Sequence, residues 1–197
     1  MPLALVSDIH GNDRTFAAVV AELERLGIDR AVCLGDAVQG GDEPRQVLDR
    51  LAQLGWPVIL GNADDFLLHV PVDSPEPVTE AQLAKREWTL AQLEPHHLEQ
   101  IRSFTPTVEI GALLAFHGSP RSYDDILLPE SDEVAPWSGT SAAILAGGHT
   151  HLQWTRTIDG ALYVNPGSVG VSDDGLAQFA ILTGPSVVFE RVPWNAS

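Results

Sequence analysis

Hydrophobic residues in the first third of the chain alternate between short apolar runs and stripes at helical spacing. Apolar runs at residues 2–6, 31–34 and 57–60 are typical of buried strands. Between them, apolar residues recur every three to four positions and predict helices over residues 13–26 and 43–54. These crossovers are long enough to return the chain for parallel pairing, so the order favours a sheet with parallel strands.

The rest of the chain passes from helical to strand-like patterns. After a proline-rich loop at residues 70–77, helices are expected over residues 79–93 and 95–102. Further strands are then expected at residues 108–110, 113–116, 142–146, 154–158, 161–164, 177–182 and 187–192. We find no internal repeat or linker, and expect a single α/β domain over residues 1–197. Helical or loop segments are inserted around residues 68–107 and 119–140.

Acidic, histidine and asparagine side chains follow directly after five of the predicted strands. In chain order the segments are Asp8-Ile9-His10-Gly11-Asn12, Gly35-Asp36, Gly61-Asn62-Ala63-Asp64, His117-Gly118 and Gly147-Gly148-His149-Thr150-His151. Ligands of open α/β sheets gather at the carboxyl ends of the strands. We therefore expect these side chains to meet at one edge of the fold.

The residue types indicate a site for divalent metal ions. Imidazole and carboxylate groups suit Mn, Fe, Zn or Ni, and the set contains no thiolate. Residues two apart in an extended segment point the same way, so Asp8 with His10, and His149 with His151, can each face one cavity. Asp36 has two carboxylate oxygens and can bridge two ions. Two ions about 3.5–4 Å apart suit phosphoryl transfer, because they activate a water and bind the phosphoryl oxygens.

Amino-acid composition limits the classes of molecule that the protein is expected to bind. The chain has 197 residues, and 27 acidic against 11 basic residues give a net charge of −16. That balance argues against nucleic acid and membrane surfaces as partners, and a phosphate ligand would need metal ions for positive charge. A single cysteine, Cys33, excludes an internal disulfide. Without a leader-like N-terminus or a spanning apolar run, we expect a cytoplasmic protein.

Together, the five segments resemble the signature of the calcineurin-like metallophosphoesterases, and most of all the small bacterial and archaeal phosphodiesterases of the YfcE type. The loop Asn165-Pro166-Gly167-Ser168 adds to the resemblance. It implies a four-layer αββα sandwich with the two metals at the strand ends. One metal is then held by Asp8, His10, Asp36 and His151, and the other by Asp36, Asn62, His117 and His149.

The same resemblance implies hydrolysis of a small phosphate ester by a hydroxide that bridges the two ions. We expect Asp36, His117 and His149 to be catalytic, Asn12 and Asn62 to bind substrate, and the metals to be manganese, or else iron, zinc or nickel. A homo-oligomer is possible. The remaining histidines (His69, His96 and His97) are expected to be surface or packing residues, and the acids Asp124, Asp125, Glu130, Asp132 and Glu133 to form a solvated loop.

Two departures from the family pattern bear on the substrate. Many members carry a histidine after the Gly-Asn pair, which contacts the phosphoryl group or protonates the leaving oxygen, where this chain has Ala63. Protein phosphatases of the superfamily carry an arginine shortly after the Gly-Asp pair, which is absent after Asp36. A phosphodiesterase is therefore the leading hypothesis. A phosphomonoesterase or nucleotidase, and a non-catalytic scaffold on the same fold, are the alternatives.

Overall fold

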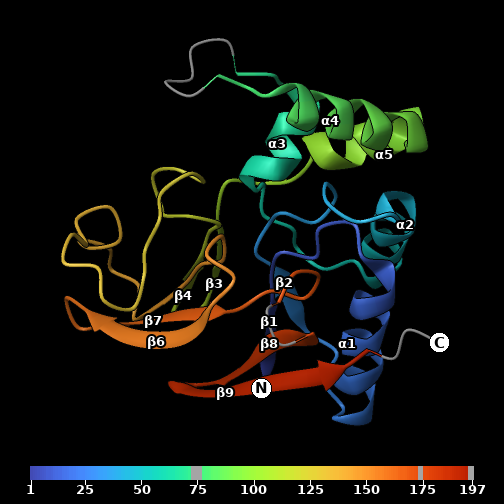
Figure 1. The fold of residues 1–197 in the computed structure, drawn as a ribbon. Coiled ribbons are helices and arrows are strands. Elements are labelled where there is room, and N and C mark those ends of the chain that lie inside the picture. Colours follow the sequence, from blue (N-terminus) through green and yellow to red (C-terminus); the bar gives the residue numbers. More distant parts are fainter. Residues whose placement is uncertain (72–76, 173–174, 195–197) are drawn as a thin grey trace.

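Two β-sheets lie face to face and carry helices on one outer side (Figure 1). The computed structural model describes residues 1–71, 77–172 and 175–194. Most of the expected loop at residues 70–77 therefore lies outside the described residues. The first sheet has the order β2-β1-β8-β9, and the second has the order β3-β4-β5-β7-β6.

The first sheet joins the two ends of the chain. Its strands are β1 (Leu3–Val6), β2 (Ala31–Cys33), β8 (Leu176–Thr183) and β9 (Ser186–Pro193). Strands β1 and β2 pair in parallel, as the crossover predicted, whereas β8 runs antiparallel to β1. Alternation along β1 serves two cores: Leu3 and Leu5 face the second sheet, while Ala4 and Val6 face the helices.

The second sheet is built from the middle of the chain. Its strands are β3 (Val108–Ile110), β4 (Leu113–Ala115), β5 (Ile144–Ala146), β6 (Gln153–Ile158) and β7 (Ala161–Pro166). Strands β4, β5 and β7 are parallel, and the two edge strands are antiparallel to their neighbours. The predicted strand at residues 57–60 is only extended chain beside β2, held by the isolated bridges Cys33–Val58 and Ile59–Thr105.

Helices cover the outer face of the first sheet and extend above it. They are α1 (Asp13–Arg25), α2 (Pro44–Leu54), α3 (Asn62–Leu68), α4 (Glu80–Gln92) and α5 (Pro95–Arg102). Apolar side chains of α1 and α2, including Phe16 and Leu48, pack on this sheet, and Ile101 of α5 joins the same core. Helix α3 was not predicted, because the sequence pattern placed the segment Gly61-Asn62-Ala63-Asp64 only as a site segment after a strand.

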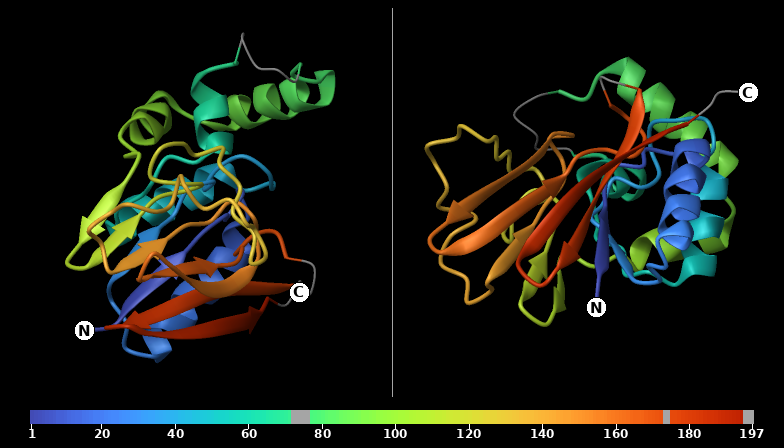
Figure 2. Two further views of the ribbon diagram at one scale, coloured as in Figure 1. Left: turned by 90° about the vertical axis from the view of Figure 1, so that its left-hand side faces the viewer. Right: turned by 90° about the horizontal axis from the view of Figure 1, so that it is seen from below.

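The predicted αββα fold is confirmed, with a loop as its outermost layer on the second sheet. Seen from below, helices, first sheet, second sheet and this loop follow one another across the molecule (Figure 2). Leu127 and Trp137 of the 119–140 segment pack on Trp154, Ile158 and Tyr163 of the second sheet. Across the described residues there is no helix long and apolar enough to span a membrane.

Candidate metal centre

All seven predicted metal ligands come together where the loops after β1, β2, β4 and β5 meet the start of α3. Strands from both sheets supply these loops, and the side chains meet at one edge of the fold, as expected from the sequence. Six of the residues form two compact triads. They are Asp8, His10 and His151 in the first triad, and Asp36, His117 and His149 in the second.

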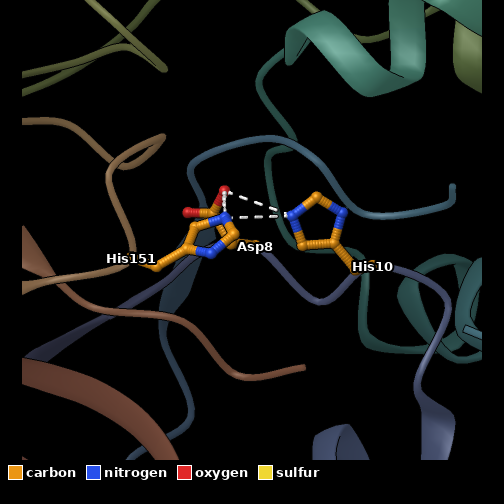
Figure 3. A group of neighbouring side chains, drawn as sticks. All are labelled: Asp8, His10 and His151. Carbon is orange, nitrogen blue, oxygen red and sulfur yellow. Dashed lines mark hydrogen bonds and ion pairs between the residues drawn. The ribbon is translucent and has the colours of Figure 1, made fainter. Parts of the chain in front are cut away.

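In the first triad, two imidazole rings and one carboxylate point to a common centre (Figure 3). The Nε2 atoms of His10 and His151 lie 3.1 Å apart. Asp8 Oδ1 lies 3.2 Å from Nε2 of His151 and 3.7 Å from Nε2 of His10. Three donor atoms so close together could serve as three corners of a coordination site.

The second triad is completed by Asn62, the first residue of α3. Its Oδ1 lies 3.0 Å from Nε2 of His117 and 3.0 Å from Nδ1 of His149. The carboxylate Oδ2 of Asp36 lies 3.5 Å from Nε2 of His117. Nitrogen and oxygen donors again converge, in the set that first-row divalent metals prefer.

Asp36 lies between the two triads. The oxygen that faces His117, Oδ2, also lies 3.8 Å from Nε2 of His10. The other oxygen, Oδ1, accepts a 2.8 Å hydrogen bond from the backbone N–H of Ala63. One carboxylate oxygen is thus shared by both groups, which is the position of a bridging ligand.

Backbone carbonyls orient the two histidines nearest to Asp36. The Nδ1 atom of His10 lies 2.8 Å from the carbonyl oxygen of Gln39, and Nδ1 of His117 lies 2.8 Å from that of Leu34. A carbonyl can only accept, so each Nδ1 carries the proton in the neutral ring. The Nε2 lone pair of each ring is left for the site, as is usual for metal-binding histidines.

Asp8 presents one free oxygen to its triad. Its Oδ2 accepts hydrogen bonds from the Ser7 hydroxyl at 2.5 Å and from the His149 N–H at 3.1 Å. Its Oδ1 is buried, and no described residue donates a hydrogen bond to it. A buried carboxylate oxygen without a donor is costly unless a cation compensates it. This orphan oxygen and the surrounding imidazoles fit a divalent metal.

The charges of the site also favour a cation. Burial alone would disfavour charge on Asp36 and His117, yet their attraction holds the pKa of Asp36 well below its usual range. The carboxylates of Asp36 and Asp8 raise the pKa of His117 to about 10 against its burial. For Asp8, burial is outweighed by His151, and the pKa is lowered. The centre therefore stabilises positive charge, which a metal ion provides in place of a proton.

Strained backbone is concentrated in the ligand loops. Asp8, His10, Asp36, His149 and His151 have φ between 49° and 68°, and the other described non-glycine residue with positive φ is Asp159. This left-handed conformation is uncommon outside glycine and persists only where surrounding contacts impose it. It turns the chain sharply after each strand, so that side chains from successive loops face one another.

Sequence reasoning missed the role of Asp64 in holding the loop that follows Asp36. Buried Asp64 accepts hydrogen bonds from the N–H groups of Ala37 and Val38, just after Asp36. Its own pKa is raised to about 7, through burial and then the charge of Asp36. The spacing Gly61-Asn62-x-Asp64 carried the signal, since an acid at the third helical position can cap both its own helix and a neighbouring loop.

The Asn165–Ser168 loop holds the first and last ligand segments. Asn165 Nδ2 donates to the carbonyl of Gly148 at 2.7 Å and to Oγ1 of Thr150 at 3.0 Å. The hydroxyl of Ser168 donates to the Asp8 carbonyl at 2.8 Å. The sequence singled out this loop only by its resemblance to the family, and its contacts give the physical reason.

The remaining candidates lie around the centre. Asn12 caps α1, its Oδ1 accepting from the Thr15 N–H at 3.4 Å, and its Nδ2 lies 3.5 Å from the Gly170 carbonyl. His97 is buried, accepts the Glu94 N–H and contacts Asp49, as expected of a packing histidine. Asp125 is not merely solvated, because Ser119 donates to it at 2.5 Å.

Comparisons with known proteins match the fold of the chain. The chain is 25% identical over 196 residues to an uncharacterised protein of Methanocaldococcus jannaschii, covering 88% of this chain and 78% of that one. A metallophosphoesterase structure from Sphaerobacter thermophilus superposes with a TM-score of 0.78 at 24% identity, over 99% of this chain and 89% of that chain. The Yfce phosphoesterase from E. coli superposes with a TM-score of 0.56 at 22% identity, over 99% and 100% of the two chains.

The family itself is recognised along almost the whole sequence. Residues 1–184 match the model of the calcineurin-like phosphoesterase superfamily domain. That span contains both triads and Asn62. The chain therefore belongs to the calcineurin-like phosphoesterase superfamily and is a metal-dependent phosphoester hydrolase.

Proposed function

We propose that the chain is a phosphodiesterase that uses two divalent metal ions. One ion is held by Asp8, His10, Asp36 and His151, and the other by Asp36, Asn62, His117 and His149. The observation that carries the proposal is the pair of triads joined by Asp36 Oδ2, at 3.8 Å from His10 and 3.5 Å from His117. Two such ions supply an activated water and positive charge for attack at phosphorus.

The protein residues position the substrate and the ligands. Asp36, His117 and His149 are the proposed catalytic residues, since they touch the reacting centre. Asn62 directs its Oδ1 to two imidazoles, which leaves its Nδ2 available to donate to a phosphoryl oxygen. The Nδ2 of Asn12 has a 3.5 Å contact with the Gly170 carbonyl, and we propose that it also donates to a phosphoryl oxygen.

Diesters are favoured over monoesters by the residue beside Asn62. Ala63 lines the cavity next to the metal centre and carries no group that can give a proton to the leaving oxygen. An alkyl monoester has a basic leaving group and a second negative charge, and the surrounding acids Asp65 and Asp124 disfavour that charge. A diester of the same alcohol has the same leaving group but one negative charge, so it meets only the first obstacle, and a diester with an activated leaving group meets neither.

Manganese is the proposed metal. Each ion would have two imidazole nitrogens among its ligands, and Mn²⁺ accepts such mixed nitrogen and oxygen sets better than Mg²⁺. Iron, zinc and nickel suit the same donors. Activity measured on protein reconstituted with each metal separates these choices.

The proposal is tested with two chromogenic esters that share a leaving group. The manganese-loaded protein is given bis(p-nitrophenyl) phosphate and p-nitrophenyl phosphate under identical conditions. We expect the diester to be hydrolysed with the higher kcat/KM. Faster hydrolysis of the monoester would instead identify a phosphomonoesterase, and no metal-dependent hydrolysis of either would identify a non-catalytic scaffold.

A further inference from the structure

A cavity of about 490 Å³ opens directly beside the second triad. Its wall includes the ligand Asn62 and, next to it, Ala63, whose side chain is a single methyl group. The cavity therefore begins at the metal centre. A phosphate ester bound there would extend one of its alcohol groups into this space.

The wall of the cavity is acidic and aromatic. The carboxylates of Asp65 and Asp124 and the rings of Phe66 and Tyr123 line it. None of its described lining residues is a lysine or an arginine. An aromatic ring face attracts a cation, and a carboxylate does so more strongly.

Hydrogen bonds fix one of the two acids in place. The Tyr123 hydroxyl donates to Asp65 Oδ2 at 2.8 Å, and Nδ1 of His69 lies 2.9 Å from Asp65 Oδ1. The bond from Tyr123 ties α3 to the loop that carries Tyr123. The ring of Tyr123 is thereby held against the cavity together with the carboxylate.

The second acid of the wall, Asp124, is paired with no described residue through its carboxylate, and its backbone N–H donates to Oγ of Ser122. This carboxylate is exposed beside the metal centre and is free to bind a ligand that brings N–H groups and positive charge.

We propose that this cavity selects phosphodiesters of an amino alcohol, with the positively charged ammonium group placed between Asp65 and Asp124. This inference rests on the proposed phosphodiesterase function and adds the class of substrate. A nucleoside polyphosphate would instead place further negative charge against two carboxylates, in a wall whose described residues include no lysine or arginine.

The test uses two esters that differ only in charge. The 2-aminoethyl and n-propyl esters of p-nitrophenyl phosphate have similar shape and the same leaving group. In both, water attacks phosphorus, the bond to the nitrophenyl oxygen breaks, and nitrophenolate leaves while the proton goes to solvent. We expect kcat/KM of the manganese-loaded protein to be about tenfold or more higher for the aminoethyl ester, mainly through KM.

Two conservative variants test whether Asp65 and Asp124 cause the preference for the aminoethyl ester. Asp65→Asn keeps an acceptor for Tyr123, and Asp124→Asn removes a carboxylate that holds no other described group. Each should reduce the preference for the aminoethyl ester several-fold and leave kcat/KM for the propyl ester within about twofold. The matched control Asp132→Asn, an exposed acid outside the cavity, should leave the preference unchanged.

The outcomes separate this inference from the proposed function. Hydrolysis of the propyl ester without a preference for the aminoethyl ester would overturn the ammonium site alone, as would a preference that survives both variants. If neither ester is hydrolysed, calorimetry decides with 2-aminoethyl phosphate and n-propyl phosphate as ligands of the metal-loaded protein. Tighter binding of the aminoethyl compound supports the site, and equal binding overturns it.

Discussion

At the scale of single residues, Asp36 has the most demanding position in the centre. It faces His10 and His117 with one oxygen and the backbone of Ala63 with the other. Gly61 makes this possible, because a Cβ at that position would overlap the Asp36 carboxylate. The proposed bridging role therefore depends on the Asp36 side chain and on the absence of a side chain at Gly61.

Replacing Asp36 with asparagine should reduce turnover by several orders of magnitude. The change removes one negative charge between two proposed cations but keeps an oxygen that accepts from Ala63. Circular dichroism of the metal-free variant should match that of the parent chain. Asp42→Asn, an exposed acid on the same loop, is the control and should retain full activity. An Asp36→Asn enzyme of near-parental rate would show that Asp36 is not a ligand.

Replacing Ala63 with histidine should change which esters are hydrolysed. The new imidazole would reach the cavity beside Asn62 and could protonate a departing oxygen, an effect typically worth about 10²–10⁴ in rate. We expect rates on alkyl phosphomonoesters to rise relative to activated diesters, and the dependence on leaving-group pKa to flatten.

Ala63→Gln controls for the added volume, since glutamine fills similar space without an acid of suitable pKa. It should lower all rates together. Equal leaving-group slopes for the parent chain and Ala63→His, with metal content matched, would remove the argument that links Ala63 to diester preference.

At the scale of elements, the ligand loops depend on a neighbour that provides no ligand. Asn165 at the end of β7 donates to Gly148 and Thr150, on the loop that carries His149 and His151. These donors and acceptors are buried or partly buried, so losing the amide leaves them unpaired.

Asn165→Ala should lower the free energy of unfolding by about 1–3 kcal/mol and also weaken metal binding, because the strained loop loses its support. Chemical denaturation and metal titration give the two quantities. Thr150→Val removes only the contact with the hydroxyl and should have a smaller effect on both. If Asn165→Ala changes stability but not metal affinity, the loop does not need this support.

The elements themselves were largely predictable from local patterns, and their assembly was not. Helix α5 has the predicted bounds, and α1, α2 and α4 differ from prediction by a residue at one or both ends. Helix α3 has seven residues and is too short for a clear apolar period, so local patterns predicted no helix there. Which strands share a sheet depends on long-range pairing, such as β1 with β8, and local patterns carry no such information.

The candidate site was likewise predictable in its residue types and not in the contacts that hold it. The ligand residue types and their positions after strands were readable in the sequence, and the structure places all of them together. The left-handed backbone at residues such as His149, and the clamps formed by Asp64 and Asn165, arise only from contacts between loops. Those contacts exist only once both sheets are packed.

At the scale of the whole molecule, the excess of acidic residues makes the stability of the folded state depend on bound metal ions. The chain carries a net charge of −16, and its metal centre holds buried carboxylates at Asp8 and Asp36 with a further one at Asp64. Ions bound there reduce this repulsion and stabilise the folded state by mass action, by about 2.7 kcal/mol for each site at a hundredfold excess over Kd. The melting temperature should therefore rise with manganese concentration.

The central claim is that two ions share Asp36, and counting bound metal while following hydrolysis tests it most directly. The protein is stripped with a chelator, manganese is added back in steps, and bound metal per chain is measured beside the hydrolysis of bis(p-nitrophenyl) phosphate. We predict no activity after chelation and full activity at two bound ions per chain. Full activity in the stripped protein, or saturation at one bound ion, would contradict the account.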